Sequence, residues 1–94
     1  MMSEVPVDLG KVAKKDVDRE ILRVGMIAEL DAVSLYEQLA AMTTDEGIKR
    51  VLLEVAKEEK THVGEFQALL LKFDKEQLAE LKSGEKEVDD LISR

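Results

Sequence analysis

Residues 45–72 read DEGIKRVLLEVAKEEKTHVGEFQALLLK, and this stretch decides the fold. Residues taken about every 3.5 positions along it are almost all apolar, which is the pattern of one buried helix face. The series runs one residue past the stretch and comprises Ile48, Leu52, Val55, Glu59, His62, Phe66, Leu69 and Phe73. Only Glu59 and His62 are polar, and they lie near the middle. The pattern predicts an amphipathic helix whose apolar seam is interrupted by a carboxylate and an imidazole.

The residues before this stretch show the same apolar pattern, again interrupted by a carboxylate. Residues 16–42 contain no proline and repeat apolar side chains at the same spacing, through Leu22, Met26, Glu29, Val33, Tyr36 and Ala40. The carboxylate of Glu29 interrupts it near mid-length, and Gly25 permits close approach of a neighbouring helix. Thr43 and Glu46 fit a capping box, so the connection is short and we expect antiparallel helices. Antiparallel packing would bring Glu29 to the height of the polar pair in the other seam.

The remaining residues extend this hairpin at both ends. Residues 1–15 have no sustained period and are predicted to form an N-terminal arm. Residues 16–82 are predicted to form a helical domain, and residues 83–94 a C-terminal tail or short helix. The fold class is therefore all-α: an antiparallel two-helix hairpin plus a short C-terminal helix.

The short C-terminal helix has recognisable start and stop signals. Asp74 followed by Gln77 resembles a helix cap, because an Asp side chain can accept the backbone N–H three residues on. The helix is expected to run through Leu81. Ser83-Gly84 is expected to end it, since glycine is the preferred residue just beyond a helix C-terminus.

Composition excludes several classes of function. The chain has 94 residues, with 21 Asp and Glu against 14 Lys and Arg, and a net charge of -7. Nucleic acids and anionic membranes attract clustered Lys and Arg, so neither is expected as a partner. The chain contains no cysteine, which excludes disulfides and thiolate chemistry. It contains no run of about 18 apolar residues and no signal-peptide core, and we expect a cytoplasmic protein.

The polar interruptions of the two seams predict a metal site. A carboxylate on a buried seam is costly unless it is paired or ligates a metal. Glu59 and His62 have the i, i+3 spacing that places both on one helix face. A Glu from one helix and a Glu-x-x-His from another form half of a ferritin-like di-iron site. The chain supplies this set, Glu29, Glu59 and His62, only once. Two chains are therefore expected to dimerise into a four-helix bundle with the metals at their interface.

Other interpretations of these residues remain open. A Glu-x-x-His pair occurs by chance, and a lone buried histidine is often a hydrogen-bonded core residue. Tyr36 is either a core aromatic or a hydroxyl donor to a ligating carboxylate. Glu58 is either a solvated residue paired with Lys57 or Lys60, or an acceptor that orients the His62 ring.

Two segments resemble a known family. Ala28 to Glu37, AELDAVSLYE, and Glu58 to Phe66, EEKTHVGEF, are similar to segments of the encapsulated ferritins, short ferritin-like proteins housed in encapsulin shells. The resemblance covers roughly residues 16–82. It is strongest to the archaeal branch, in which this domain precedes the shell protein or is fused to it. The two motifs are specific in combination because both match in spacing and in order.

The resemblance implies a function and a set of site residues. Members pair into four-helix bundles, assemble into a ring-shaped decamer and oxidise Fe(II) to Fe(III) at a site that binds two irons. The ligand positions of the family correspond to Glu29, Glu59 and His62. Its tyrosine corresponds to Tyr36, and an outer acidic position through which metal enters corresponds to Asp31. The resemblance therefore predicts a ferroxidase that supplies iron for storage inside an encapsulin nanocompartment.

The sequence departs from the family pattern at three places. An additional carboxylate beside the first ligand is replaced by Ala28, and a tryptophan near the site is replaced by Leu35. Both departures concern the outer metal position and leave the three ligands intact. Residues 88–94 do not resemble the short apolar peptide that targets cargo to the shell. The chain is expected either to be cut from a fusion or to reach its shell in another way.

Three rival classes compete with the ferroxidase. A rubrerythrin-type redox protein normally has rubredoxin-like cysteines, which are absent here. A non-catalytic metal-binding helical dimer would hold zinc or calcium without oxidising iron. A plain helical interaction module would use the polar residues to set the register of its helices.

Overall fold

The computed structural model describes Asp8, Gly10 and residues 13–94, so most of the expected N-terminal arm lies outside the described residues. A short 3₁₀ helix, Lys14–Asp16, leads into three α-helices: α1 (Val17–Met42), α2 (Glu46–Phe73) and α3 (Lys75–Ile92). These described residues contain no strand, which confirms the all-α class. None of the described helices is long and apolar enough to cross a membrane. The division into arm, domain and tail stays a prediction.

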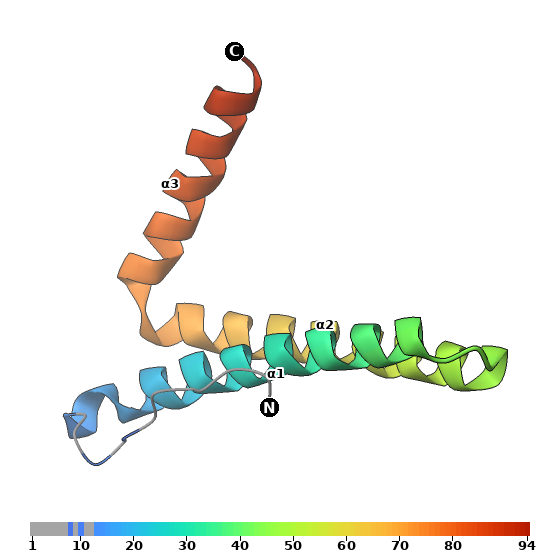
Figure 1. Ribbon diagram of the computed structural model, residues 1–94. Coiled ribbons are helices and arrows are strands. Elements are labelled where there is room, and N and C mark those ends of the chain that lie inside the picture. The colour runs from blue at the N-terminus through green and yellow to red at the C-terminus, as the bar shows by residue number, and fades with distance from the viewer. Residues whose placement is uncertain (1–7, 9, 11–12) are drawn as a thin grey trace.

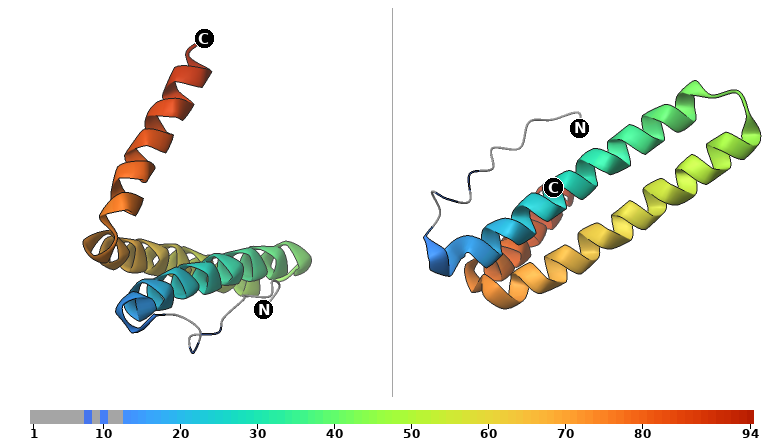
Figure 2. Two further views of the ribbon diagram at one scale, coloured as in Figure 1. Left: turned by 90° about the vertical axis from the view of Figure 1, so that its left-hand side faces the viewer. Right: turned by 90° about the horizontal axis from the view of Figure 1, so that it is seen from below.

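Helices α1 and α2 form the expected antiparallel hairpin (Figure 1; Figure 2, right). Their boundaries agree with the sequence-based ones to within one residue. Gly25 of α1 lies against the ring of Phe66 on α2, and a Cβ added at Gly25 would be 3.3 Å from that ring. The prediction that Gly25 permits close approach of the helices is therefore confirmed.

A thin core joins the two helices. The buried apolar side chains are small or aliphatic: Leu22, Val33 and Ala40 from α1, with Ala56 and Leu70 from α2. Among the described residues, no large side chain is completely buried, and many large apolar side chains are exposed. A single hairpin of this size buries too little apolar surface to be more than marginally stable by itself.

The connection between α1 and α2 uses a different cap from the one expected. Asp45, and not Thr43, is the N-cap of α2, because the Asp45 carboxylate accepts the backbone N–H of Ile48 at 2.8 Å. The Thr43 hydroxyl accepts the backbone N–H of Asp45 at 3.1 Å. Both residues are good caps, and the carboxylate has the added advantage of a negative charge at the helix N-terminus.

Asp74 is the single residue between α2 and α3, and we call the bend at this residue the elbow. Its backbone N–H donates to the carbonyl oxygen of Leu70 at 2.9 Å, which closes the last turn of α2. Its side chain accepts the backbone N–H of Gln77 at 2.9 Å, which confirms the predicted cap of α3. Because one residue serves both helix ends, α3 starts immediately in a new direction and projects from one end of the hairpin (Figures 1 and 2).

The expected end of α3 at Ser83-Gly84 is wrong, since the helix continues to Ile92. A glycine that ends a helix usually adopts a positive φ, and no described glycine does so. Strong helix formers surround Gly84, and Lys86 pairs with Asp90 one turn on at 2.8 Å. Together these offset the cost of a glycine inside a helix, which is about 1 kcal/mol.

Candidate metal centre

Glu59 and His62 lie on one face of α2, as their spacing predicts. Nδ1 of His62 is 3.4 Å from Oε2 of Glu59. No proline interrupts this part of α2, so the i, i+3 geometry of a regular helix brings the two side chains together. The proximity of Glu59 and His62 therefore follows from the sequence of α2 alone.

Glu29 reaches the same place from α1. Its Oε2 is also 3.4 Å from Nδ1 of His62, although the two residues are 33 positions apart. One ligand atom from each of Glu29, Glu59 and His62 lies within 4.8 Å of the other two. The antiparallel hairpin thus brings together the three residues that the sequence singled out as ligands.

The electrostatics of this cluster favour a cation. Two carboxylates lie at equal distances from one ring nitrogen, so a positive charge at that point is attracted by both. The glutamate side chains are 20% and 19% exposed, which limits screening by water, whereas His62 is 44% exposed. Carboxylate oxygens with one imidazole nitrogen suit Fe(II), Mn(II) or Zn(II). The donor set therefore fits the iron implied by the resemblance.

The cluster is open on the side of His62. Val51 precedes His62 and Leu69 and Phe73 follow it along the same face of α2 by helical spacing. All three apolar side chains are exposed in the single chain. Exposed apolar side chains on both sides of a polar ligand are typical of a surface that another protein covers. The cluster of Glu29, Glu59 and His62 therefore lies beside apolar side chains that the single chain leaves exposed.

The other residues singled out in the sequence do not join the cluster. Tyr36 is partly buried, but among the described residues its hydroxyl makes no hydrogen bond to Glu29 or Glu59. Asp31 follows Glu29 by two positions and so lies on another side of α1. Glu58 is exposed and makes no contact with the His62 ring that meets hydrogen-bond or ion-pair criteria in the described part of the chain.

Sequence patterns did not reveal one ion pair that joins the helices near this site. Lys60 pairs with Glu37 of α1 at 3.0 Å, and not with Glu58 of its own helix. Both side chains are largely exposed, so the pair contributes little to stability. Each has several candidate partners in the sequence, and only the rotation of the two helices selects this one.

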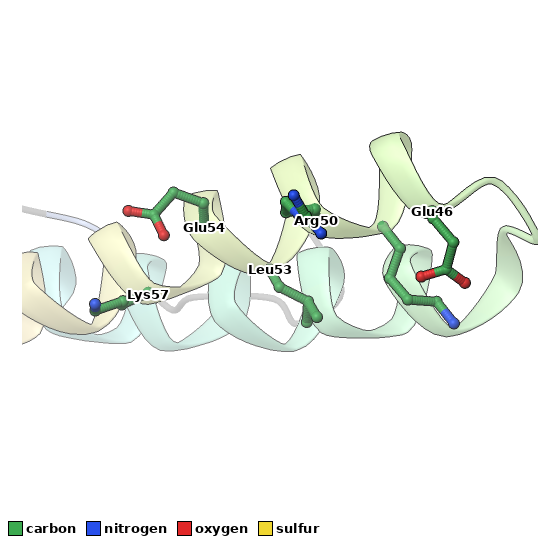
Figure 3. A pocket seen from close by; sticks show the side chains of 6 residues that line it. Glu46, Arg50, Leu53, Glu54 and Lys57 are labelled. Atoms are coloured by element: carbon green, nitrogen blue, oxygen red, sulfur yellow. The ribbon is translucent and has the colours of Figure 1, made fainter.

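A depression lies near the tip of the hairpin (Figure 3). None of Glu29, Glu59 and His62 lines it. It has a volume of about 420 Å³ and is lined by successive turns of α2 alone: Glu46, Lys49, Arg50, Leu53, Glu54 and Lys57. Acidic and basic side chains alternate along it, which is typical of a solvated helix face. It offers no group of converging ligands and is not a candidate site.

The fold and the cluster together define a class of protein: a helical hairpin that presents one half of a ferritin-like carboxylate–histidine centre. Residues 5–83 match the EncFtn-like family, and the chain belongs to this family. A crystal structure described as the encapsulated ferritin domain from Pyrococcus furiosus is similar to the whole chain. Its TM-score is 0.84 at 49% identity, over 100% of this chain and 98% of that chain.

Two curated relatives also point to the encapsulated ferritins. A ferritin-like-encapsulin shell fusion protein of Pyrococcus furiosus is 53% identical over 85 residues, which are 90% of this chain and 25% of that protein. The encapsulin nanocompartment cargo protein EncC of Myxococcus xanthus is 36% identical over 74 residues, 76% of this chain and 57% of that protein. The chain thus spans about a quarter of the first and just over half of the second. The resemblance to encapsulated ferritins is confirmed.

Proposed function

We propose that this chain oxidises Fe(II) to Fe(III) at a di-iron site that two copies complete, and that it supplies iron for storage inside an encapsulin shell. The observation that carries the proposal is the cluster of Glu29, Glu59 and His62, whose ligand atoms lie within 4.8 Å of one another. A full ferritin-like centre requires this set twice. One chain has it once, so a second copy must supply the other half.

The open face of the hairpin supports this dimer. Burying the exposed apolar side chains that flank His62 would contribute about 25 cal/mol for each Å² removed from water. A two-fold axis through this face would place the same three ligands of the second copy opposite those of the first. The result would be a four-helix bundle with its metal centre in the core.

Each ligand has a proposed role. Glu59 from each chain would bridge two irons, Glu29 would hold one iron at its outer side, and His62 would supply the nitrogen donor. Iron held there would supply one electron from each Fe(II), and two such electrons with two protons would reduce one dioxygen to hydrogen peroxide. The low exposure of both carboxylates limits the screening by water of their attraction to a cation. The net charge of -7 would raise the local concentration of Fe(II).

The location follows from the names of the relatives. One is a ferritin-like domain fused to an encapsulin shell, and the other is a cargo protein of an encapsulin nanocompartment. We place this chain in the same kind of compartment, as a homo-oligomer such as the ring-shaped decamer implied by the resemblance. A ring has no closed cavity, so mineral storage would need the shell.

The test is stoichiometric addition of Fe(II) to the purified chain, with oxygen consumption and iron absorbance recorded. Oxidation is expected in the wild type and not in Glu59→Ala or His62→Ala, with helicity by circular dichroism unchanged. Glu58→Gln is the matched control, because it removes an exposed neighbouring charge and should keep full activity. Oxidation retained in both ligand variants refutes the assignment. Metal binding without oxygen consumption leaves the non-catalytic metal-binding dimer.

A further inference from the structure

Methionine is the only sulfur-containing residue type of this chain, which has four methionines and no cysteine. Two of them, Met26 and Met42, lie among the described residues, and both belong to α1. Met42 at the tip of the hairpin is 78% exposed, whereas Met26 is partly buried. A thioether can take up one oxygen atom and become a sulfoxide, which is a common oxidative change in proteins. The two methionines therefore offer the same chemistry in two different surroundings.

Met26 lies in the turn of α1 that leads into the metal cluster. Two contacts with α2 bracket this turn. On one side, a Cβ added at Gly25 would be 3.3 Å from the ring of Phe66. On the other, Oε2 of Glu29 is 3.4 Å from Nδ1 of His62. Met26 precedes Glu29 by three residues, about 4.5 Å along the helix axis, and residues at this spacing are neighbours on a helix surface. Its side chain is therefore adjacent to a candidate ligand.

A groove on the surface of the molecule exposes part of the Met26 side chain. The groove has a volume of about 310 Å³, and its apolar lining includes Met26, Ile27, Leu30 and Leu70. None of the three metal ligands lines it. Met26 thus lies between the metal cluster on one side and a solvent-filled groove on the other.

The margin of the groove suits an oxidised methionine. Gln67 and Gln77 line the groove, and among the described residues neither side-chain amide makes a hydrogen bond. Each amide has two N–H donors, and the oxygen of a sulfoxide is a polar acceptor. The groove can therefore hold Met26 as the apolar thioether or as the polar sulfoxide.

We infer that Met26 is a site of oxidation by the hydrogen peroxide that forms when iron is oxidised at the cluster; this inference rests on the proposed function. The sulfur lone pair attacks one oxygen of the peroxide, so that an S–O bond forms and the O–O bond breaks. The other oxygen leaves as water with both hydrogens. The sulfur is oxidised by two electrons and the peroxide is reduced by two. Each chain can take up one oxygen atom in this way until the sulfoxide is reduced again.

The positions of the two methionines distinguish local peroxide from peroxide in solution. Met42 is 16 residues further along α1 than Met26, about 24 Å at 1.5 Å per residue. Peroxide that leaves the cluster therefore encounters Met26 first. Peroxide that is added to the solution encounters Met42 first, because that side chain is far more exposed.

The test is peptide mass spectrometry of the full chain after aerobic oxidation of Fe(II). Cleavage after glutamate places Met26 in residues 21–29 and Met42 in residues 38–46, so the oxygen added to each is measured separately. Because proximity raises the local rate, Met26 should be oxidised roughly tenfold more than Met42, and catalase in solution should not change this ratio. The control is the apo chain treated with hydrogen peroxide, in which Met42 should be oxidised first.

Two leucine variants test the same site by a second measurement. Met26→Leu removes the sulfur and keeps an apolar side chain of similar size, so helicity and the rate of Fe(II) oxidation should not change. During the first turnover it should release about twofold more hydrogen peroxide into solution than the wild type, because the sulfur that takes up the oxygen is missing. Met42→Leu is the matched control and should release as much as the wild type.

The outcomes separate this inference from the proposed function. Fe(II) oxidation without oxygen on Met26, equal oxidation of Met26 and Met42, or protection of Met26 by catalase overturns the inference and leaves the proposed iron oxidation intact. Equal peroxide release by Met26→Leu and the wild type also overturns it. If the wild type oxidises no Fe(II), the proposed function fails and the inference fails with it.

Discussion

Arg23 of α1 and Asp74 at the elbow form an ion pair, with 2.7 Å between Nη2 and Oδ2, across 51 positions of the chain. Asp74 also caps α3 through the backbone N–H of Gln77, so one buried carboxylate connects all three helices. The Gln77 hydrogen bond lowers the pKa of Asp74 most, desolvation opposes it, and Arg23 lowers it further. Hydrogen bonds to Glu20 and Asp74 raise the pKa of Arg23, which therefore stays charged.

Substitutions of Asp74 separate these contacts. Asp74→Asn keeps a side chain that can cap α3 but removes the charge that pairs with Arg23. Asp74→Ala removes both. We expect the melting temperature and the helical signal to decrease in the order wild type, Asp74→Asn, Asp74→Ala. Asp90→Asn, which breaks only the exposed pair with Lys86, is the control and should change neither. Equal effects of the two Asp74 variants would mean that the cap contributes nothing.

The stability of the elbow should depend on pH in the acid range. The pKa of Asp74 in the folded chain lies below its ordinary value of 3.8, so the ionised carboxylate stabilises the fold above pH 3.8. This contribution is lost as the pH falls from 3.8 through the lower folded value. We expect the difference in unfolding free energy between wild type and Asp74→Asn to be constant above about pH 5 and to shrink below pH 3.8. A pH-independent difference contradicts the lowered pKa of Asp74.

Metal binding should stabilise the folded dimer. Anaerobic Fe(II) at a hundredfold excess over its dissociation constant is expected to add about 2.7 kcal/mol to the free energy of unfolding. The stabilisation should disappear in His62→Ala and persist in Glu58→Gln. The apo chain should also be less associated than the loaded chain. Equal masses with and without Fe(II) would remove metal binding as a cause of association.

Two glycines of the hairpin should differ in their response to substitution by alanine. Gly64→Ala places a methyl group with nothing within 4 Å, so the higher helix propensity of alanine should stabilise the chain by about 0.5–1 kcal/mol. Gly25→Ala places one 3.3 Å from the Phe66 ring, which must shift, and the gain should be smaller or absent. Gly25→Leu should destabilise by about 1–3 kcal/mol. Urea unfolding measures all three, and equal gains at both glycines would contradict the close contact.

Local patterns predicted the hairpin and the proximity of Glu29, Glu59 and His62 well. The boundaries of α1 and α2 depend on apolar periodicity and on signals within a few residues, and they were predicted to within one residue. The approach of Glu29 to His62 followed from antiparallel packing of two seams interrupted at mid-length. The length of α3 was underestimated because Gly84 is a stop signal only where the chain adopts a positive φ.

The sequence by itself determined the helices, the short connection between α1 and α2, the cap at Asp74 and the choice of Glu29, Glu59 and His62 as candidate ligands. Each of these depends on spacing within a helix or on one turn. Only the tertiary structure decided the pairing of Arg23 with Asp74, the pairing of Lys60 with Glu37 and the direction of α3. These depend on the rotation of one helix against another and on the angle at the elbow. Both are set by packing between residues far apart in the chain, and no local pattern specifies them.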